Sequence, residues 1–155
     1  MQGHPDVIAC LNALLTRELS AIDQYVVQAY MLENWGYQKL YERIAHETDD
    51  ERGHVVKLVR RILFLDGMPD VASRLPLDVG KTPKEMLESD LKLELQVANS
   101  LNEAMALCRD KGDNGTRAVL EELLNDTERD HIYWLQQQLH LIDEVGIQEY
   151  LAEKI

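Results

Sequence analysis

The segment from Gln38 to Leu65, QKLYERIAHETDDERGHVVKLVRRILFL, decides the fold of this 155-residue chain. Its apolar residues recur in steps of four and three, which is the period of one face of an α-helix. The same face carries Glu47, Glu51 and His54, which are residue types that seldom lie in a protein interior. The segment is therefore predicted to be a helix whose buried stripe is interrupted near its middle by ionisable side chains.

Three further segments have the same period. Together with the first, the predicted long helices cover about residues 6–35, 38–65, 83–111 and 116–144, and a short fifth helix is predicted at 147–153. Gly and Pro gather between these segments, and Thr82 followed by Pro83 is typical of a helix start. No stretch of useful length has the alternation of a β-strand, so the chain is predicted to be all-α.

The lengths of the connections predict the topology. Short connections around Gly36 and Gly112 make helices one and two, and helices three and four, antiparallel neighbours. The connection from Asp66 to Thr82 is long enough to run the length of the bundle, so helices two and three are parallel. This is a ferritin-like four-helix bundle with one long crossover, formed by a single domain over residues 1–155.

Composition excludes several classes of function. The chain has 28 Asp and Glu against 16 Lys and Arg, a formal net charge of -12, which argues against a nucleic-acid partner and favours cations. No apolar run approaches the ~20 residues needed to cross a bilayer, so no membrane partner is expected. The first residues lack the pattern of a secretory signal, and a cytoplasmic location is predicted.

Each of the four buried stripes contains carboxylates or imidazoles near its middle. These residues are Glu18 in the first helix, Glu51 and His54 in the second, Glu94 in the third, and Glu128 and His131 in the fourth. The two Glu-x-x-His pairs have i,i+3 spacing, so both side chains of a pair are expected on one helix face. Two such pairs and two single glutamates, on four helices, are the ligand pattern of di-iron and di-manganese carboxylate bundles.

The pattern has a physical reason. A carboxylate inside a bundle has a desolvation cost of several kcal/mol, so four at one level need compensation. Two divalent cations supply four positive charges while the two imidazoles stay neutral, and this donor set suits iron or manganese. One Glu-x-x-His in an acidic helix is typical of a solvated face, but four helices contributing at matching depth favour a metal centre. Tyr25, on the stripe of Glu18, is either a hydrogen-bond donor to this centre or a core aromatic residue.

Several short stretches match one family. They are Met1–Ile8 (MQGHPDVI), Asn34-Trp35-Gly36, Arg61–Leu65 (RILFL), Glu85-Met86-Leu87 with Asp90-Leu91, and Gly146–Leu151 (GIQEYL). On these stretches, and on the order of the six candidate ligands, the chain resembles the bacterioferritins over essentially its full length. The resemblance implies that 24 subunits form a hollow shell. It also implies that the protein is a ferroxidase, which oxidises Fe(II) with oxygen or peroxide at an intrasubunit di-iron site and stores the Fe(III) mineral inside the shell.

The resemblance also implies roles for single residues. Glu18 and His54 would bind one iron, Glu94 and His131 the other, and Glu51 and Glu128 would bridge them. His46 and Asp50 match positions that bind an extra iron on the inner surface in some members, although a solvated polar pair is the competing interpretation. Glu47 lies in the same neighbourhood and could relay iron inward. The resemblance further implies a ferredoxin-type reductant as a partner for the release of iron.

One position departs from the family. Bacterioferritins bind haem b between two subunits through a methionine at the position of Arg52, and arginine is a poor axial ligand. The chain is therefore either a haem-free homo-oligomer or the catalytic subunit of a mixed shell in which a sister subunit supplies the ligand.

Three further alternatives stay open. A di-iron oxidase or peroxidase used mainly for peroxide removal would have the same ligands, although the chain carries no Cys-x-x-Cys module. A structural subunit with a vestigial site is disfavoured because all six ligands are present. The C-terminal helix at 147–153 either lines a fourfold axis of the shell, as the resemblance implies, or docks on its own bundle.

Overall fold

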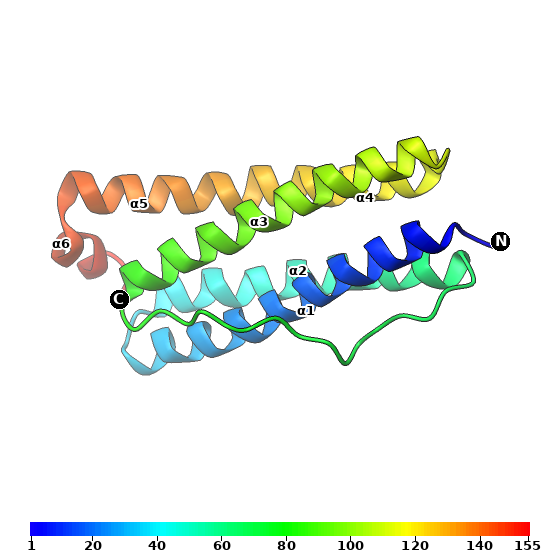
Figure 1. The fold of residues 1–155 in the computed structure, drawn as a ribbon. Helices are drawn as coiled ribbons and strands as arrows, with labels where there is room; N and C mark the ends of the chain where they lie inside the picture. The colour runs from blue at the N-terminus through cyan, green and yellow to red at the C-terminus, as the bar shows by residue number, and fades with distance from the viewer.

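Helices make up most of the computed structural model, which describes residues 1–155 (Figure 1). The elements in chain order are α1 (Pro5–Asn34), α2 (Gln38–Phe64), α3 (Pro83–Asp110), α4 (Asn114–Asp126), the π-helix η1 (Thr127–Ile132), α5 (Tyr133–Val145) and α6 (Ile147–Ala152). The segments α4, η1 and α5 follow one another without a break and form the fourth long helix of the bundle.

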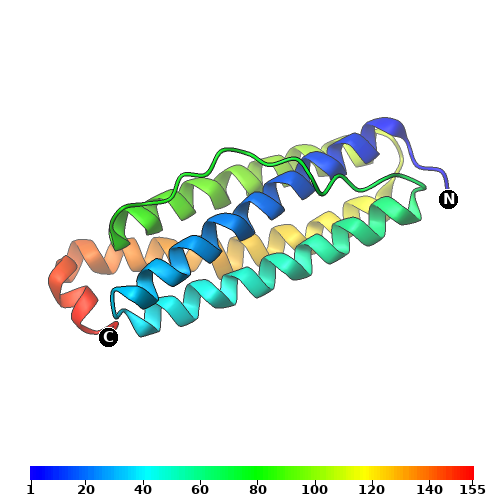
Figure 2. The same cartoon turned by 90° about the horizontal axis from the view of Figure 1, so that it is seen from below.

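The order and direction of the helices confirm the predicted topology. Helices α1 and α2 are antiparallel, as are α3 and the α4–α5 helix, while α2 and α3 run in the same direction (Figures 1 and 2). The segment between Phe64 and Pro83 contains no helix and extends along the whole bundle beside α1. The fold is thus a ferritin-like four-helix bundle with one long crossover.

Side chains of α1 hold the crossover in place. The Asn12 amide donates to the carbonyl of Met68 at 3.0 Å and accepts from the Asp70 N–H at 2.8 Å. Further along, Ser20 Oγ accepts from the N–H of Leu75 at 2.8 Å, and Gln24 Oε1 accepts from the N–H of Asp78. Because the crossover has no regular hydrogen bonding of its own, these side chains satisfy its backbone groups.

The predicted start of α3 is confirmed. Thr82 Oγ1 accepts a hydrogen bond from the N–H of Glu85, and Pro83 occupies the first turn, where its missing N–H costs nothing. The start of α4 is fixed in a similar way, because Asp113 accepts from the N–H of Thr116 at 2.9 Å. Arg61, at the end of α2, binds Asp113 at 3.2 Å and so ties the second helix to the fourth.

The hydrophobic core consists of two clusters that lie towards opposite ends of the bundle. One contains Leu11, Leu58 and Leu101, and the other contains Tyr25, Ile44 and Leu135. Buried ionisable side chains at intermediate positions of the helices separate the two clusters. The interruptions predicted from the sequence stripes are therefore a polar layer across the middle of the bundle.

Two details of the helices go beyond the prediction. The fourth helix begins at Asn114 and is π-helical from Thr127 to Ile132, where an unbroken α-helix was expected. The short α6 docks on its own bundle, because Tyr150 is buried and its hydroxyl donates to Gln138 Oε1 at 2.7 Å. No helix of the protein combines the length and apolar character that a membrane span requires.

Two glycines give opposite predictions for stability. A Cβ at Gly53, in the exposed middle of α2, would meet no other atom, so Gly53→Ala is expected to raise the free energy of unfolding by about 0.5–1 kcal/mol. A Cβ at Gly80 would overlap the backbone of Glu85 and Met86, so Gly80→Ala is expected to lower it. Urea unfolding of the metal-free protein followed by circular dichroism measures both. Equal effects of the two substitutions would contradict the packing described for the end of the crossover.

Candidate metal centre

The polar layer brings together five of the six predicted ligands, from four different elements. They are Glu18 on α1, Glu51 and His54 on α2, Glu94 on α3 and His131 on η1. Each of the five is no more than 2% exposed. Since a carboxylate or imidazolium is seldom buried without a partner, their convergence makes this layer the candidate metal centre.

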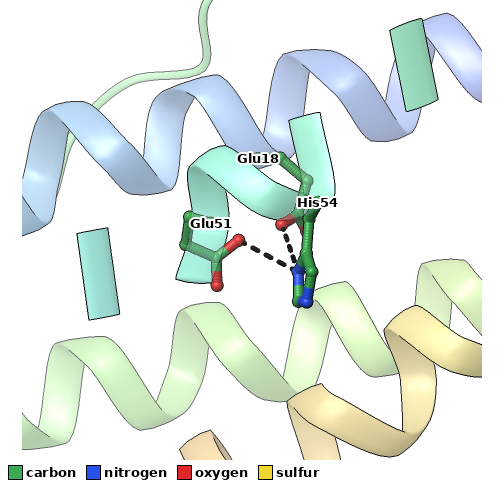
Figure 3. Close-up of side chains that lie close together, drawn as sticks. All are labelled: Glu18, Glu51 and His54. Atoms are coloured by element: carbon green, nitrogen blue, oxygen red, sulfur yellow. Dashed lines mark hydrogen bonds and ion pairs between the residues drawn. The ribbon is translucent and has the colours of Figure 1, made fainter. Parts of the chain in front are cut away.

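Glu51 lies between the two imidazoles. Its Oε2 is 3.5 Å from His54 Nδ1, and its Oε1 is 3.0 Å from His131 Nδ1. The two imidazole ring centroids are 6.0 Å apart. Figure 3 shows the first half of this arrangement, with Glu18 and Glu51 both directed at Nδ1 of His54. One carboxylate that contacts both imidazoles through separate oxygens is in the position of a bridging ligand.

Each imidazole has carboxylate partners on both its inner and its outer nitrogen. Nδ1 of His54 faces Glu18 Oε2 at 3.1 Å, and Nδ1 of His131 faces Glu94 Oε1 at 3.1 Å. On the outer side, Nε2 of His54 is 3.2 Å from Asp126 Oδ2, a side chain that is 50% exposed. The two imidazoles thus point Nδ1 into the bundle and Nε2 towards its surface.

The outer side of His131 carries two acidic groups. Its Nε2 is 2.7 Å from Glu47 Oε2 and 3.5 Å from Asp50 Oδ2, and these three residues form a third group able to hold a cation. Asp50 also lies 3.4 Å from Nε2 of the exposed His46, which confirms the predicted side-by-side placement of His46 and Asp50. A chain of polar side chains therefore leads from the surface to His131.

Glu128 is the one predicted ligand that the structure does not bring into the group. Its side chain is exposed, although His131 three residues later is buried. The expected shared face depends on α-helical geometry, and residues 127–132 are π-helical. In the wider turn of a π-helix, His131 follows one turn after Asp126 and Thr127, so Glu128 points away. Thr127 is fully buried at the position where the fourth carboxylate was expected.

A second polar group borders the centre and was missed by the sequence analysis. Asp90 is fully buried and accepts from Gln24 Nε2 at 2.9 Å, while its Oδ2 has no hydrogen-bond partner. Burial raises the pKa of Asp90 well above its ordinary value, although the Gln24 hydrogen bond opposes this. Its i,i+4 relation to Glu94 was a signal available in the sequence. Tyr25 is a hydrogen-bond donor to Glu94, which settles the alternative left open for it.

The buried carboxylates hold protons on both imidazoles. Burial alone would lower the pKa of His54, but hydrogen bonds with Glu18 and Glu51 outweigh it and raise the pKa to about 11. Against the same effect of burial, the glutamates around His131 raise its pKa too. Burial, and then the charge on Glu51, raise the pKa of Glu18. Protons on His54 and His131 therefore supply the positive charge that this layer needs when no metal is bound.

The donor atoms fit two divalent cations. Both oxygens of Glu51 and one of Glu94 are buried without a well-formed hydrogen bond. The groups Glu18, Glu51, His54 and Glu51, Glu94, His131 each offer ligand atoms that lie within 4.8 Å of one another, and they share Glu51. Carboxylate oxygens with one imidazole per group suit iron or manganese better than metals that prefer thiolates.

Comparison with known proteins agrees with this arrangement. The family model described as a ferritin-like domain matches residues 8–145. A bacterial ferritin of Pseudomonas aeruginosa is 50% identical, with all of both chains covered. The chain belongs to the bacterial ferritin family. Other members include a bacterial ferritin of Synechocystis sp., 47% identical over the whole chain and 99% of the relative, and a bacterioferritin of Mycolicibacterium paratuberculosis, 40% identical over 99% of the chain and 96% of the relative.

Metal binding to this family member is expected to release protons. An imidazole must be neutral to bind a metal, and at pH 7 His54 is protonated because its pKa is about 11. With His131 behaving in the same way, Zn²⁺ binding should release the protons of both imidazoles and any proton that the raised pKa of Glu18 retains, and the affinity should increase with pH. Calorimetry in buffers of different ionisation enthalpy measures the number. His131→Ala should reduce it, whereas His140→Ala, at an exposed imidazole, should not.

The π-helix predicts which carboxylate contributes to cation binding. Glu94→Gln should weaken Zn²⁺ binding because Glu94 contacts Nδ1 of His131, whereas Glu128→Gln should leave it unchanged because Glu128 is exposed. Equilibrium dialysis with metal analysis measures both variants under the same conditions. If Glu128→Gln weakens binding as much as Glu51→Gln does, Glu128 is a ligand and this assignment of the ligands is wrong.

Proposed function

We propose that the protein stores iron and that it oxidises Fe(II) at the centre formed by Glu18, Glu51, His54, Glu94 and His131. The position of Glu51 between the two imidazoles carries this proposal, because it allows two ions to be held close together. Membership of the bacterial ferritin family supports the iron assignment. The Fe(III) is then deposited as a mineral within a shell of 24 copies of the chain.

Two Fe(II) ions held side by side supply two electrons at once. Reduction of O₂ to H₂O₂ consumes two electrons and two protons, and reduction of H₂O₂ to two waters consumes the same number. His54 and His131 must lose their protons to bind the ions, so these protons leave before the oxidant reacts, and the protons that the oxidant consumes come from solvent. The contribution of the chain is to fix the ligands in a desolvated layer.

The polar chain from His46 through Asp50 to Glu47 and His131 gives iron a route to the centre. His46 is exposed, Asp50 is partly exposed, and Glu47 is buried, so the ligands become progressively less hydrated towards His131. This gradation supports Glu47 as the residue that relays iron inward.

Arg52 favours an assembly that binds no haem through this chain. It is exposed on α2 directly after Glu51, at the position where bacterioferritins carry the haem-ligating methionine. A guanidinium cannot act as an axial ligand to haem iron. A homo-oligomer of this chain would then be free of haem at that position, and a mixed shell would take the ligand from a sister subunit.

Removing a ligand tests the oxidation site. Glu18→Ala and His131→Ala should each slow rapid Fe(II) oxidation about a hundredfold or more, because each removes a ligand to one of the two ions. Stopped-flow absorbance of anaerobic protein mixed with oxygen measures the rate, and size-exclusion chromatography reports whether assembly is retained. Glu144→Ala, at an exposed residue on α5, is the matched control. Unchanged kinetics in both ligand variants would exclude this centre as the site of oxidation.

Iron loading of the wild-type protein distinguishes storage from the alternative function, a di-iron oxidase that removes peroxide. A storage protein retains far more iron than two ions per chain after repeated additions of Fe(II), whereas an oxidase releases its product. Iron that stays with the protein through gel filtration is therefore measured after loading. A value near two ions per chain would contradict storage and favour the oxidase.

A further inference from the structure

Arg43 makes three contacts at the outer edge of the metal centre. Its Nε is 2.8 Å from Glu47 Oε1, and its Nη2 donates to the carbonyl of Asp130 at 2.8 Å. Its guanidinium carbon lies 4.5 Å from the centroid of the Trp134 ring. The guanidinium thus joins α2 to η1 at the residue before His131 and rests on the first turn of α5.

These contacts place a permanent positive charge beside a candidate cation ligand. Glu47 divides its two oxygens between Arg43 and His131, with Oε1 towards the guanidinium and Oε2 towards the imidazole. Glu47 is almost fully buried whereas Arg43 is 30% exposed, so solvent screens this charge pair only from the side of the guanidinium. Arginine keeps its charge at any pH at which the protein is folded, so it cannot give way by losing a proton as an imidazole can.

We propose that Arg43 competes with divalent cations for Glu47 and so keeps the group Glu47, Asp50 and His131 from retaining a cation. Arg43 holds Oε1 of Glu47 and leaves only Oε2 for an ion, and the charge of the guanidinium lowers the affinity of that oxygen for a cation. The group then passes cations to the buried ligands and does not compete with them. This inference rests on the proposed function, because it assumes that cations reach His131 from this side.

The π-helix explains why Arg43 can occupy this place. The Asp130 carbonyl lies in the segment where α-helical hydrogen bonding is interrupted, and the guanidinium donates to it. Trp134 supports the flat guanidinium from the side of α5 through a cation–π contact. Lysine at this position would keep the charge but could not bond Glu47 and the carbonyl in the same fork geometry.

The proposal predicts tighter retention of a third ion when the charge is removed. Wild-type protein should bind two Zn²⁺ per chain tightly. A third should bind at Glu47 and Asp50 only at much higher free zinc, because the neutral imidazole of His131 has one lone pair and Nδ1 uses it for the inner ion. Arg43→Gln should bind that third ion at about tenfold lower free zinc, because a neighbouring opposite charge no longer occupies Glu47. Arg43→Lys should stay close to wild type. Equilibrium dialysis with metal analysis gives the stoichiometry at each free zinc concentration.

Two controls make the result specific. Arg60→Gln removes the same charge from an exposed position on α2, so a general effect of net charge would appear there too. The double variant Arg43→Gln with Glu47→Gln should lose the added ion, because the ligand that Arg43 occupied is gone. If Arg43→Gln does not fold, Arg43→Met keeps the contact with Trp134 and carries the same comparison.

The outcomes separate this inference from the proposed function. If wild-type protein fails to bind two Zn²⁺ per chain, the proposed centre is wrong. If wild-type protein binds two Zn²⁺ per chain, but removal of the Arg43 charge leaves the affinity for a third Zn²⁺ unchanged or lower, then Arg43 does not compete with cations for Glu47. An equal increase in the affinity for a third Zn²⁺ in Arg60→Gln would also overturn the inference, since the change in net charge would then be the cause.

Discussion

The burial of several carboxylates at one level of a helical bundle is the constraint on which the rest of this structure depends. Five acidic side chains are no more than 3% exposed there, namely Glu18, Glu47, Glu51, Asp90 and Glu94. Each would cost several kcal/mol without a compensating charge or hydrogen bond. The metal-free chain meets this need with protons on His54 and His131, with Arg43, and with the amide of Gln24. In the proposed function, a pair of divalent cations would replace these two protons and add two further positive charges to the layer.

The rest of the bundle must compensate for the cost of burying this polar layer. Two apolar clusters stand on either side of the polar layer, so hydrophobic burial stabilises the helices above and below the site. Each of the four long helices contributes to the layer near its middle. Helical residues therefore precede and follow each candidate ligand and hold its backbone in place. The crossover, held by Asn12, Ser20 and Gln24, lets α2 and α3 run parallel and present their ligands at one depth.

Helical periodicity was sufficient to predict the four long helices, the crossover and the convergence of five buried candidate ligands, because each depends on a repeat that is regular over many residues. It did not predict the exposed placement of Glu128, because a Glu-x-x-His pair shares a face only if the backbone between the two residues is α-helical, and nothing in the period signals a π-helix. Asp126 was missed for the same reason. The role of Arg43 was beyond the sequence as well, because its contacts join residues 87 positions apart.

The two imidazoles are equivalent in form but not in surroundings. Each turns Nδ1 towards Glu51 and Nε2 towards a partly exposed aspartate, which is Asp126 for His54 and Asp50 for His131. Only His131 has a buried carboxylate between its Nε2 and the surface, and that carboxylate, Glu47, is paired with Arg43. This pair comes from the i,i+4 spacing of Arg43 and Glu47 on α2, and the π-helix adds a carbonyl, that of Asp130, to which Arg43 also donates. Two residues one turn apart on α2 therefore give the two halves of the centre different electrostatics.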